Sequence, residues 1–146
     1  MTHPATTLNE LIEIARDGQA FYTDAIGRVR DPNLKVVFRG IIDAKAELIA
    51  ALADHVRERG MLPSTSGTFT GYFRQLYADI NATLSEAKDA TFVARLEESE
   101  DRLLVAFEDA AAAAETPDLR DIILRHLPKV RLCHDQMRNL RMSLAA

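Results

Sequence analysis

Charged and polar side chains stand at positions that a helical bundle would bury. Lys45 shares a helix face with apolar residues three and four positions away, and Glu100 interrupts a second apolar series. An unpaired buried charge is unstable, and a buried lysine tends to lose its proton instead. We therefore expect Lys45 to pair with Glu100, in a buried polar cluster made of Lys45, Glu100, Arg131, His134 and Tyr22.

Three interpretations of this cluster remain open: Lys45 reaches water at the bundle edge, an ion-pair network fixes helix register, or the residues form a metal or catalytic site. Di-metal sites in four-helix bundles use Glu-x-x-His pairs. That motif is absent, because the residues three before His55, His126 and His134 are Leu52, Ile123 and Arg131. We favour the structural network and expect no catalytic residue, no cofactor and no metal. If iron or another divalent metal binds, Glu100 and His134 are the expected ligands.

Three further candidates have ordinary structural explanations. Cys133 is expected to be a small core residue, since adjacent helical residues point in different directions and His134 is then poorly placed as its base. His55 and His126 are expected to be partly exposed or satisfied rather than metal ligands. The stretch "DAAAAAE" (109–115) favours close helix approach or a dimer contact.

Composition limits the classes of partner. A net charge of −4 and a pI near 5.5 predict no nucleic-acid or anionic-membrane partner. The start of the chain lacks a secretory pattern, and the apolar runs are too short to span a bilayer. A single cysteine fits a reducing compartment. We therefore expect a cytoplasmic protein.

The hydrophobic spacing predicts an all-α fold. Residues three and four apart repeat along five segments, and strand patterns are absent. Expected helix starts are a capping box at Thr7 and Glu10, and Asp-Pro-type starts at Asp31–Pro32 and Thr116–Pro117.

We predict one domain over residues 1–146, with a hairpin at 7–60, a crossover at 61–88 and a hairpin at 89–144. A shift of 85 residues places Tyr22 on Phe107 and Pro32 on Pro117, so the two hairpins resemble each other. A crossover helix, marked by Phe69, Phe73, Leu76, Ile80 and Leu84, then carries the chain along the bundle in an up-down-down-up four-helix arrangement.

Nearly the whole chain resembles the ferritin-like superfamily, specifically a rubrerythrin-related bacterial family known only as a domain of unknown function. The resemblance is carried by "LNELIEIARDGQAFYTDAIGRVRDPNLKVVF", "EESEDRLLVAFEDA" and "LRDIILRHLPKVRLCHDQMRNL". It implies a bundle with the crossover described above. It also implies six metal-ligand positions, of which only Glu100 and His134 keep a ligand residue; the other four hold Ala15, Lys45, Leu48 and Arg131. Lys45 would then replace the charge of a metal ion.

These features lead us to expect a non-enzymatic protein, folded as a bundle with a degenerate di-metal site. It would act by self-association, as a homodimer or higher homo-oligomer, or through an unknown protein partner; the resemblance implies a role in bacterial stress physiology. One alternative is a di-iron type oxidase or iron-handling protein with a nonstandard site. A second alternative is a small-ligand binder with a polar pocket around Lys45, Tyr22 and Glu100.

Overall fold

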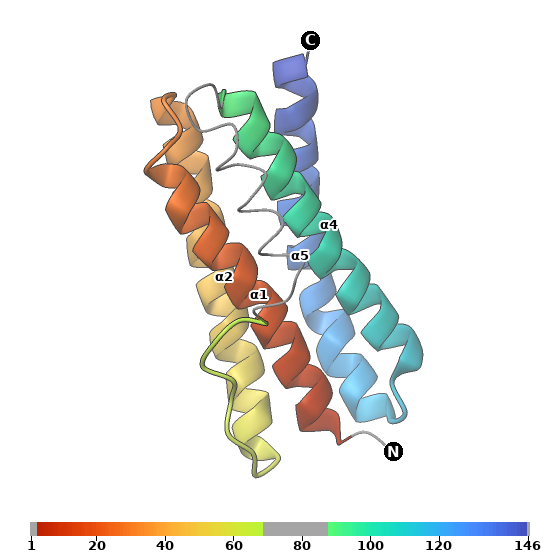
Figure 1. The fold of residues 1–146 in the computed structure, drawn as a ribbon. Coiled ribbons are helices and arrows are strands. Elements are labelled where there is room, and N and C mark those ends of the chain that lie inside the picture. The colour runs from red at the N-terminus through yellow and green to blue at the C-terminus, as the bar shows by residue number, and fades with distance from the viewer. Residues whose placement is uncertain (1–2, 69–87, 146) are drawn as a thin grey trace.

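The computed structural model describes residues 3–68 and 88–145. These residues form four helices and no strand (Figure 1): α1 (Pro4–Ile26), α2 (Pro32–Glu58), α4 (Asp89–Ala113) and α5 (Pro117–Ala145). The all-α prediction is confirmed for these residues. The predicted crossover helix, which Phe69, Phe73, Leu76, Ile80 and Leu84 mark in the sequence, lies outside the described residues. None of the described helices combines the length and the apolar character that a membrane span needs.

Local sequence signals explain most helix ends. The Asp31 carboxylate accepts a hydrogen bond from the Asn33 backbone N–H at 2.9 Å, and Pro32 occupies the first helical position of α2. The Thr116 hydroxyl accepts the Leu119 N–H at 3.2 Å at the start of α5. Gly60 ends the α2 region with a φ of 76°, a conformation that favours glycine.

One predicted helix start is wrong. Helix α1 begins at Pro4, three residues before the expected capping box at Thr7. His3 acts as the N-cap, and its Nδ1 accepts the Ala5 N–H at 3.0 Å. Because Pro4 has the backbone angle of a first helical residue, it allows the helix to start one turn earlier.

Polar contacts at the two ends of the bundle establish the helix directions. At one end, the Asp89 carboxylate at the start of α4 accepts the N–H groups of Arg30 and Asp31, each at 2.9 Å. At the other end, Arg59 pairs with Asp118 at the start of α5. Helices α2 and α4 therefore run the same way, opposite to α1 and α5 (Figure 1), and the chain between Arg59 and Asp89 joins opposite ends of the bundle.

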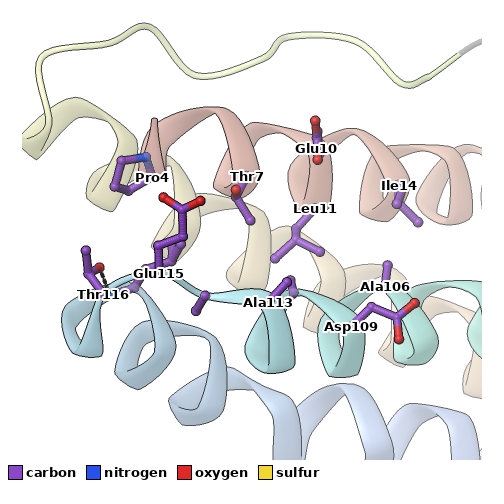
Figure 2. Close-up of a pocket in the computed structure, with 13 residues that line it drawn as sticks. Pro4, Thr7, Glu10, Leu11, Ile14, Ala106, Asp109, Ala113, Glu115 and Thr116 are labelled. Carbon is purple, nitrogen blue, oxygen red and sulfur yellow. Dashed lines mark hydrogen bonds between the residues drawn. The ribbon is translucent and has the colours of Figure 1, made fainter. Parts of the chain in front are cut away.

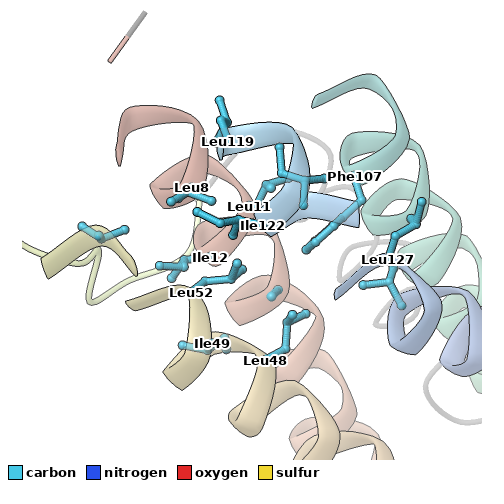
Figure 3. Close-up of a cluster of buried hydrophobic side chains, with 14 of the residues drawn as sticks. Leu8, Leu11, Ile12, Leu48, Ile49, Leu52, Phe107, Leu119, Ile122 and Leu127 are labelled. Atoms are coloured by element: carbon cyan, nitrogen blue, oxygen red, sulfur yellow. The ribbon is translucent and has the colours of Figure 1, made fainter. Parts of the chain in front are cut away.

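The apolar core has two parts. One part lies toward the start of α1, where Leu8, Ile12 and Leu52 pack with Phe107 and residues of α5 (Figure 3). The other lies toward the α1–α2 turn and contains the aromatic residues Phe21, Tyr22, Phe38 and Phe92. Each fully buried side chain of this size contributes roughly 1.5–3 kcal/mol.

A central layer separates the two parts of the core, and each of the four described helices contributes to it. Its members are Gly18 of α1, Lys45 of α2, Ser99 and Glu100 of α4, and Cys133 of α5. On each helix the apolar residues before and after this level belong to different core clusters. The unusual charges therefore lie at the middle of the bundle.

Candidate functional site

Lys45 and Glu100 form a buried ion pair in the central layer. Lys45 Nζ lies 2.7 Å from Glu100 Oε1, and the two side chains are 3% and 0% exposed. The Tyr22 hydroxyl donates a second hydrogen bond to the same oxygen at 2.8 Å. Lys45 Nζ also lies 5.7 Å from the centre of the Tyr22 ring. Side chains from α1 and α2 thus meet at a single carboxylate oxygen of an α4 side chain.

Small neighbours make room for this arrangement. A Cβ atom at Gly18 would lie 3.2 Å from Lys45 Cε and 3.3 Å from Ser99 Oγ, both tight contacts. Glycine at position 18 therefore lets the lysine side chain cross the face of α1 toward Glu100.

The electrostatics of the layer keep its neighbours protonated. Burial, followed by the charge and hydrogen bond of Glu100, raises the pKa of Tyr22 well above its ordinary value. Burial, followed by the Glu100 charge, also raises the pKa of Cys133, and Lys45 offsets only part of this. Because the thiolate is the nucleophile, a thiol with a raised pKa is poorly suited to attack. Tyr22 serves as a neutral hydrogen-bond donor.

The space beside the ion pair is small. A cavity of about 20 Å³ is lined by Lys45, Cys133 and the apolar Leu48, Leu103 and Val130, among others. This volume suits about one water molecule and is far below the roughly 300–1,000 Å³ of organic-ligand sites. The second oxygen of Glu100, Oε2, is buried and has no hydrogen-bond partner within residues 3–68 and 88–145.

Two predicted members of the buried cluster lie elsewhere, and that part of the prediction is wrong. Arg131 is half exposed and pairs with Glu108 on α4 at 3.9 Å. His134 lies at the α4–α5 edge, where it contacts Asp101 and, at 3.1 Å, Asp135. The α5 residue that faces the layer is Cys133. Since successive helical residues differ by about 100° in direction, an error of one or two positions moves a side chain from core to edge.

His134 belongs to a second group of possible ligands at that edge. Glu97, Asp101 and His134 can each offer one ligand atom, and these atoms all lie within 4.8 Å of one another. Burial lowers the pKa of His134, but hydrogen bonds to Asp135 and Asp101 outweigh this and raise its pKa overall. Arg141 donates to Glu97 Oε2 at 2.7 Å. The i, i+4 spacing of the two carboxylates was the sequence signal for this group, and it was missed.

Asp17 was also missed. Its side chain is buried, accepts the Thr68 backbone N–H at 2.9 Å and the Thr68 hydroxyl, and pairs with Arg102 at 3.2 Å. A Cβ atom at Gly67 would lie only 2.0 Å from Asp17 Oδ1. Asp17 therefore anchors the segment after α2 to the middle of the bundle. Asp17 and Arg102 are 85 residues apart, which equals the shift that relates the two hairpins.

An open groove of about 490 Å³ lies between the first half of α1 and the last turns of α4 (Figure 2). Apolar side chains such as Leu11 and Ala113 line it, together with the carboxylates of Glu10, Asp109 and Glu115. Among the described residues that line it, none is a lysine or an arginine. We call this hollow the acidic groove.

Comparison with known proteins adds a family but no relative of known function. No curated protein and no solved structure matches the chain. One family model matches residues 3–113, which is more than half of the chain. The chain therefore belongs to the family described as "Domain of unknown function (DUF2383)".

Proposed function

We propose that this protein is a ferritin-like bundle whose di-metal position is filled by its own ion pair, and that it acts non-enzymatically, by self-association. The observation that carries the proposal is the 2.7 Å contact between Lys45 Nζ and Glu100 Oε1 at the centre of the bundle. A di-iron centre needs several carboxylates to offset its charge, whereas this layer holds one carboxylate and a fixed cation. The helix directions, up-down-down-up, support the ferritin-like assignment.

The ion-pair half of the proposal is tested by metal analysis. Iron and manganese are measured per chain after growth with both metals, in the wild type, in Glu100→Ala and in Asp109→Ala as a surface-carboxylate control. We expect less than about 0.1 equivalent in all three, because Lys45 opposes a cation at this position. One or two equivalents that are lost in Glu100→Ala and kept in Asp109→Ala would make the protein a metalloprotein and overturn the proposal.

Self-association is supported by two complementary surfaces on one chain. The acidic groove carries Glu10, Asp109 and Glu115 around an apolar floor. Helix α5 carries six Lys or Arg against three Asp or Glu, and exposes Leu132 (69%) and Met142 (61%). The exposed surface of α5 from a second copy, which is basic overall and partly apolar, matches the groove in charge and in polarity. Such a contact joins different surfaces, so it either closes into a ring or continues as a chain.

Two variants test this contact. Ala110→Arg fills the groove, Leu132→Asp replaces the most exposed apolar side chain of α5, and Val36→Arg is an exposed control on α2. Sedimentation velocity is expected to show oligomers for the wild type and the control, weakened by salt, and monomers for the other two. Mixing the two monomeric variants should restore a dimer, because one keeps its α5 face and the other keeps its groove. A monomeric wild type, or a mixture that does not associate, contradicts the proposal.

A second candidate function is divalent-cation handling at the α4–α5 edge. It is favoured by the 4.8 Å clustering of ligand atoms from Glu97, Asp101 and His134. The Arg141 side chain competes for Glu97. If this site operates, His134→Gln should abolish manganese or zinc binding to the purified protein, while Glu100→Ala should leave the binding unchanged.

A further inference from the structure

Two histidines face each other near the end of the bundle where α2 stops and α5 starts. The ring centroids of His55 and His126 lie 6.2 Å apart, and the ring planes meet at an angle of 65°. Helices α2 and α5 touch far less than α1 and α2 do. At the tip of the same end, Arg59 pairs with Asp118 across the two segments. The histidine contact therefore lies at a loosely packed junction between α2 and α5.

The two rings are packed as neutral groups. Nδ1 of His55 and Nε2 of His126 are buried and have no hydrogen-bond partner among the described residues. In a protonated imidazole both ring nitrogens carry a proton, so both need an acceptor. His55 has a carboxylate nearby, because Glu58 Oε2 lies 3.4 Å from its Nδ1. A charged His126 would instead keep a buried N–H without an acceptor in the described structure, which is costly.

The charges around His126 also oppose its protonation. Burial, followed by the charges of His55, Arg125 and Lys129, lowers the pKa of His126. A group whose pKa is lowered in the closed structure binds its proton more tightly once the helices separate. The closed end is therefore fully favoured above the ordinary histidine pKa of about 6.5, and it becomes less stable as the pH falls below that value.

Helices α1 and α4 offer no buried carboxylate to this pair in the described part of the chain. Their buried acids lie at the central layer or beyond it: Asp17, Glu97 and Glu100. Three exposed acids at the same end of the bundle line the acidic groove: Glu10, Asp109 and Glu115. Glu58 is thus the acid that the described structure places beside the two rings.

We propose that His55 and His126 form an acid-sensitive switch that separates the end of α2 from the start of α5. When both rings are protonated, two positive charges face each other beside Arg125 and Lys129. Separation exposes both rings to water and gives His126 Nε2 an acceptor. Since Glu58 favours a charge on His55, we expect His55 to take the first proton and His126 the second. The switch involves neither Lys45 nor Glu100, so it is independent of the function proposed above.

Native-state hydrogen exchange of the full-length protein at about pH 7.5 and about pH 5, corrected for intrinsic exchange rates, tests the switch. At the lower pH, protection of backbone amides around His55 and His126 should fall at least about tenfold more than protection around the central layer. His126→Gln cannot become charged and should remove this difference. His134→Gln, at the α4–α5 edge, is the matched control and should keep it. A difference that persists in His126→Gln contradicts the proposal.

Titration of the wild-type histidines by NMR does not depend on whether a variant folds. The ring signals should show that His55 takes up its proton at a higher pH than His126, and protection at this end should fall as His126 is protonated. If His126 is protonated while both helix ends stay fully protected, the proposal is overturned. A loss of protection spread evenly over the described helices also overturns it, because that is global acid unfolding. Neither result affects the metal and sedimentation tests of the proposed function.

Discussion

Replacing Lys45 by methionine is the sharpest perturbation of the central layer. Lys45→Met keeps an unbranched chain of similar length but removes the ammonium that lies 2.7 Å from Glu100. Glu100 is 0% exposed, and its Oε2 already lacks a partner in the described structure, so its charge would keep only the Tyr22 hydrogen bond. Removing one member of a buried pair typically costs about 3–5 kcal/mol. We expect a loss in this range at pH 7.

A double variant separates the loss of the pair from the loss of packing. Lys45→Met combined with Glu100→Gln leaves no buried charge, and the new amide oxygen can still accept the Tyr22 hydrogen bond. The double variant should lie within about 1.5 kcal/mol of the wild type, since neutral replacements of buried pairs are often tolerated. The two single effects are then strongly non-additive, as expected for residues in direct contact.

Urea unfolding followed by circular dichroism measures these differences, provided that the slope with denaturant stays constant. Arg57→Met is the control, because its pair with Asp54 is 62% and 72% exposed and should contribute about 0.2–1 kcal/mol. If Lys45→Met costs no more than Arg57→Met, the ammonium reaches water. The ion-pair explanation of the central layer would then be refuted.

Three further changes test other parts of the structure. Gly67→Ala should cost about 1–3 kcal/mol in urea unfolding, because its Cβ would lie 2.0 Å from Asp17 Oδ1. Gly40→Ala, whose Cβ would have nothing within 4 Å, is the control and should be neutral or slightly stabilising. Equal effects of the two substitutions would contradict the role of Asp17 as an anchor for the segment after α2. Burial, followed by nearby charges, lowers the pKa of His126 in the folded protein, so the unfolded chain binds the proton more readily. The free energy of unfolding should therefore fall as the pH drops below about 6.5, and His126→Gln should flatten this part of the curve of stability against pH. A curve that is unchanged in the variant would contradict this role of His126. Asp89→Ala removes the acceptor of two backbone N–H groups in the α1–α2 turn and should cost about 1 kcal/mol, with faster hydrogen exchange confined to that turn.

Sequence patterns predicted where helices begin better than the direction in which each side chain of a helix points. Capping residues at Asp31 and Thr116 act locally, so the starts of α2 and α5 could be predicted from a few neighbouring residues. The Lys45–Glu100 contact could be predicted because both charges interrupt long apolar series. The location of His134 could not, since a shift of a single position in α5 turns a side chain by about 100°.

Tertiary contacts between distant segments could not be predicted from the spacing of hydrophobic residues. Asp17 directly precedes Gly18 of the central layer, and nothing near it in the sequence indicates that Thr68 will donate to it. The His55–His126 contact depends on how α2 and α5 cross, which hydrophobic periodicity alone does not specify. Such pairings follow from tertiary packing, so they became visible only in three dimensions.

The contact between Asp17 and Arg102 has a consequence for the symmetry of the bundle. Residues related by the 85-residue shift meet here, as they would across the axis of a dimer of identical hairpins. In such a dimer the same residue would stand on both sides, so aspartate would face aspartate and arginine would face arginine. A covalently joined pair of hairpins can carry different residues at the two positions. The single chain can therefore place opposite charges at positions 17 and 102, whereas an exact two-fold dimer of one hairpin would carry the same residue at both positions.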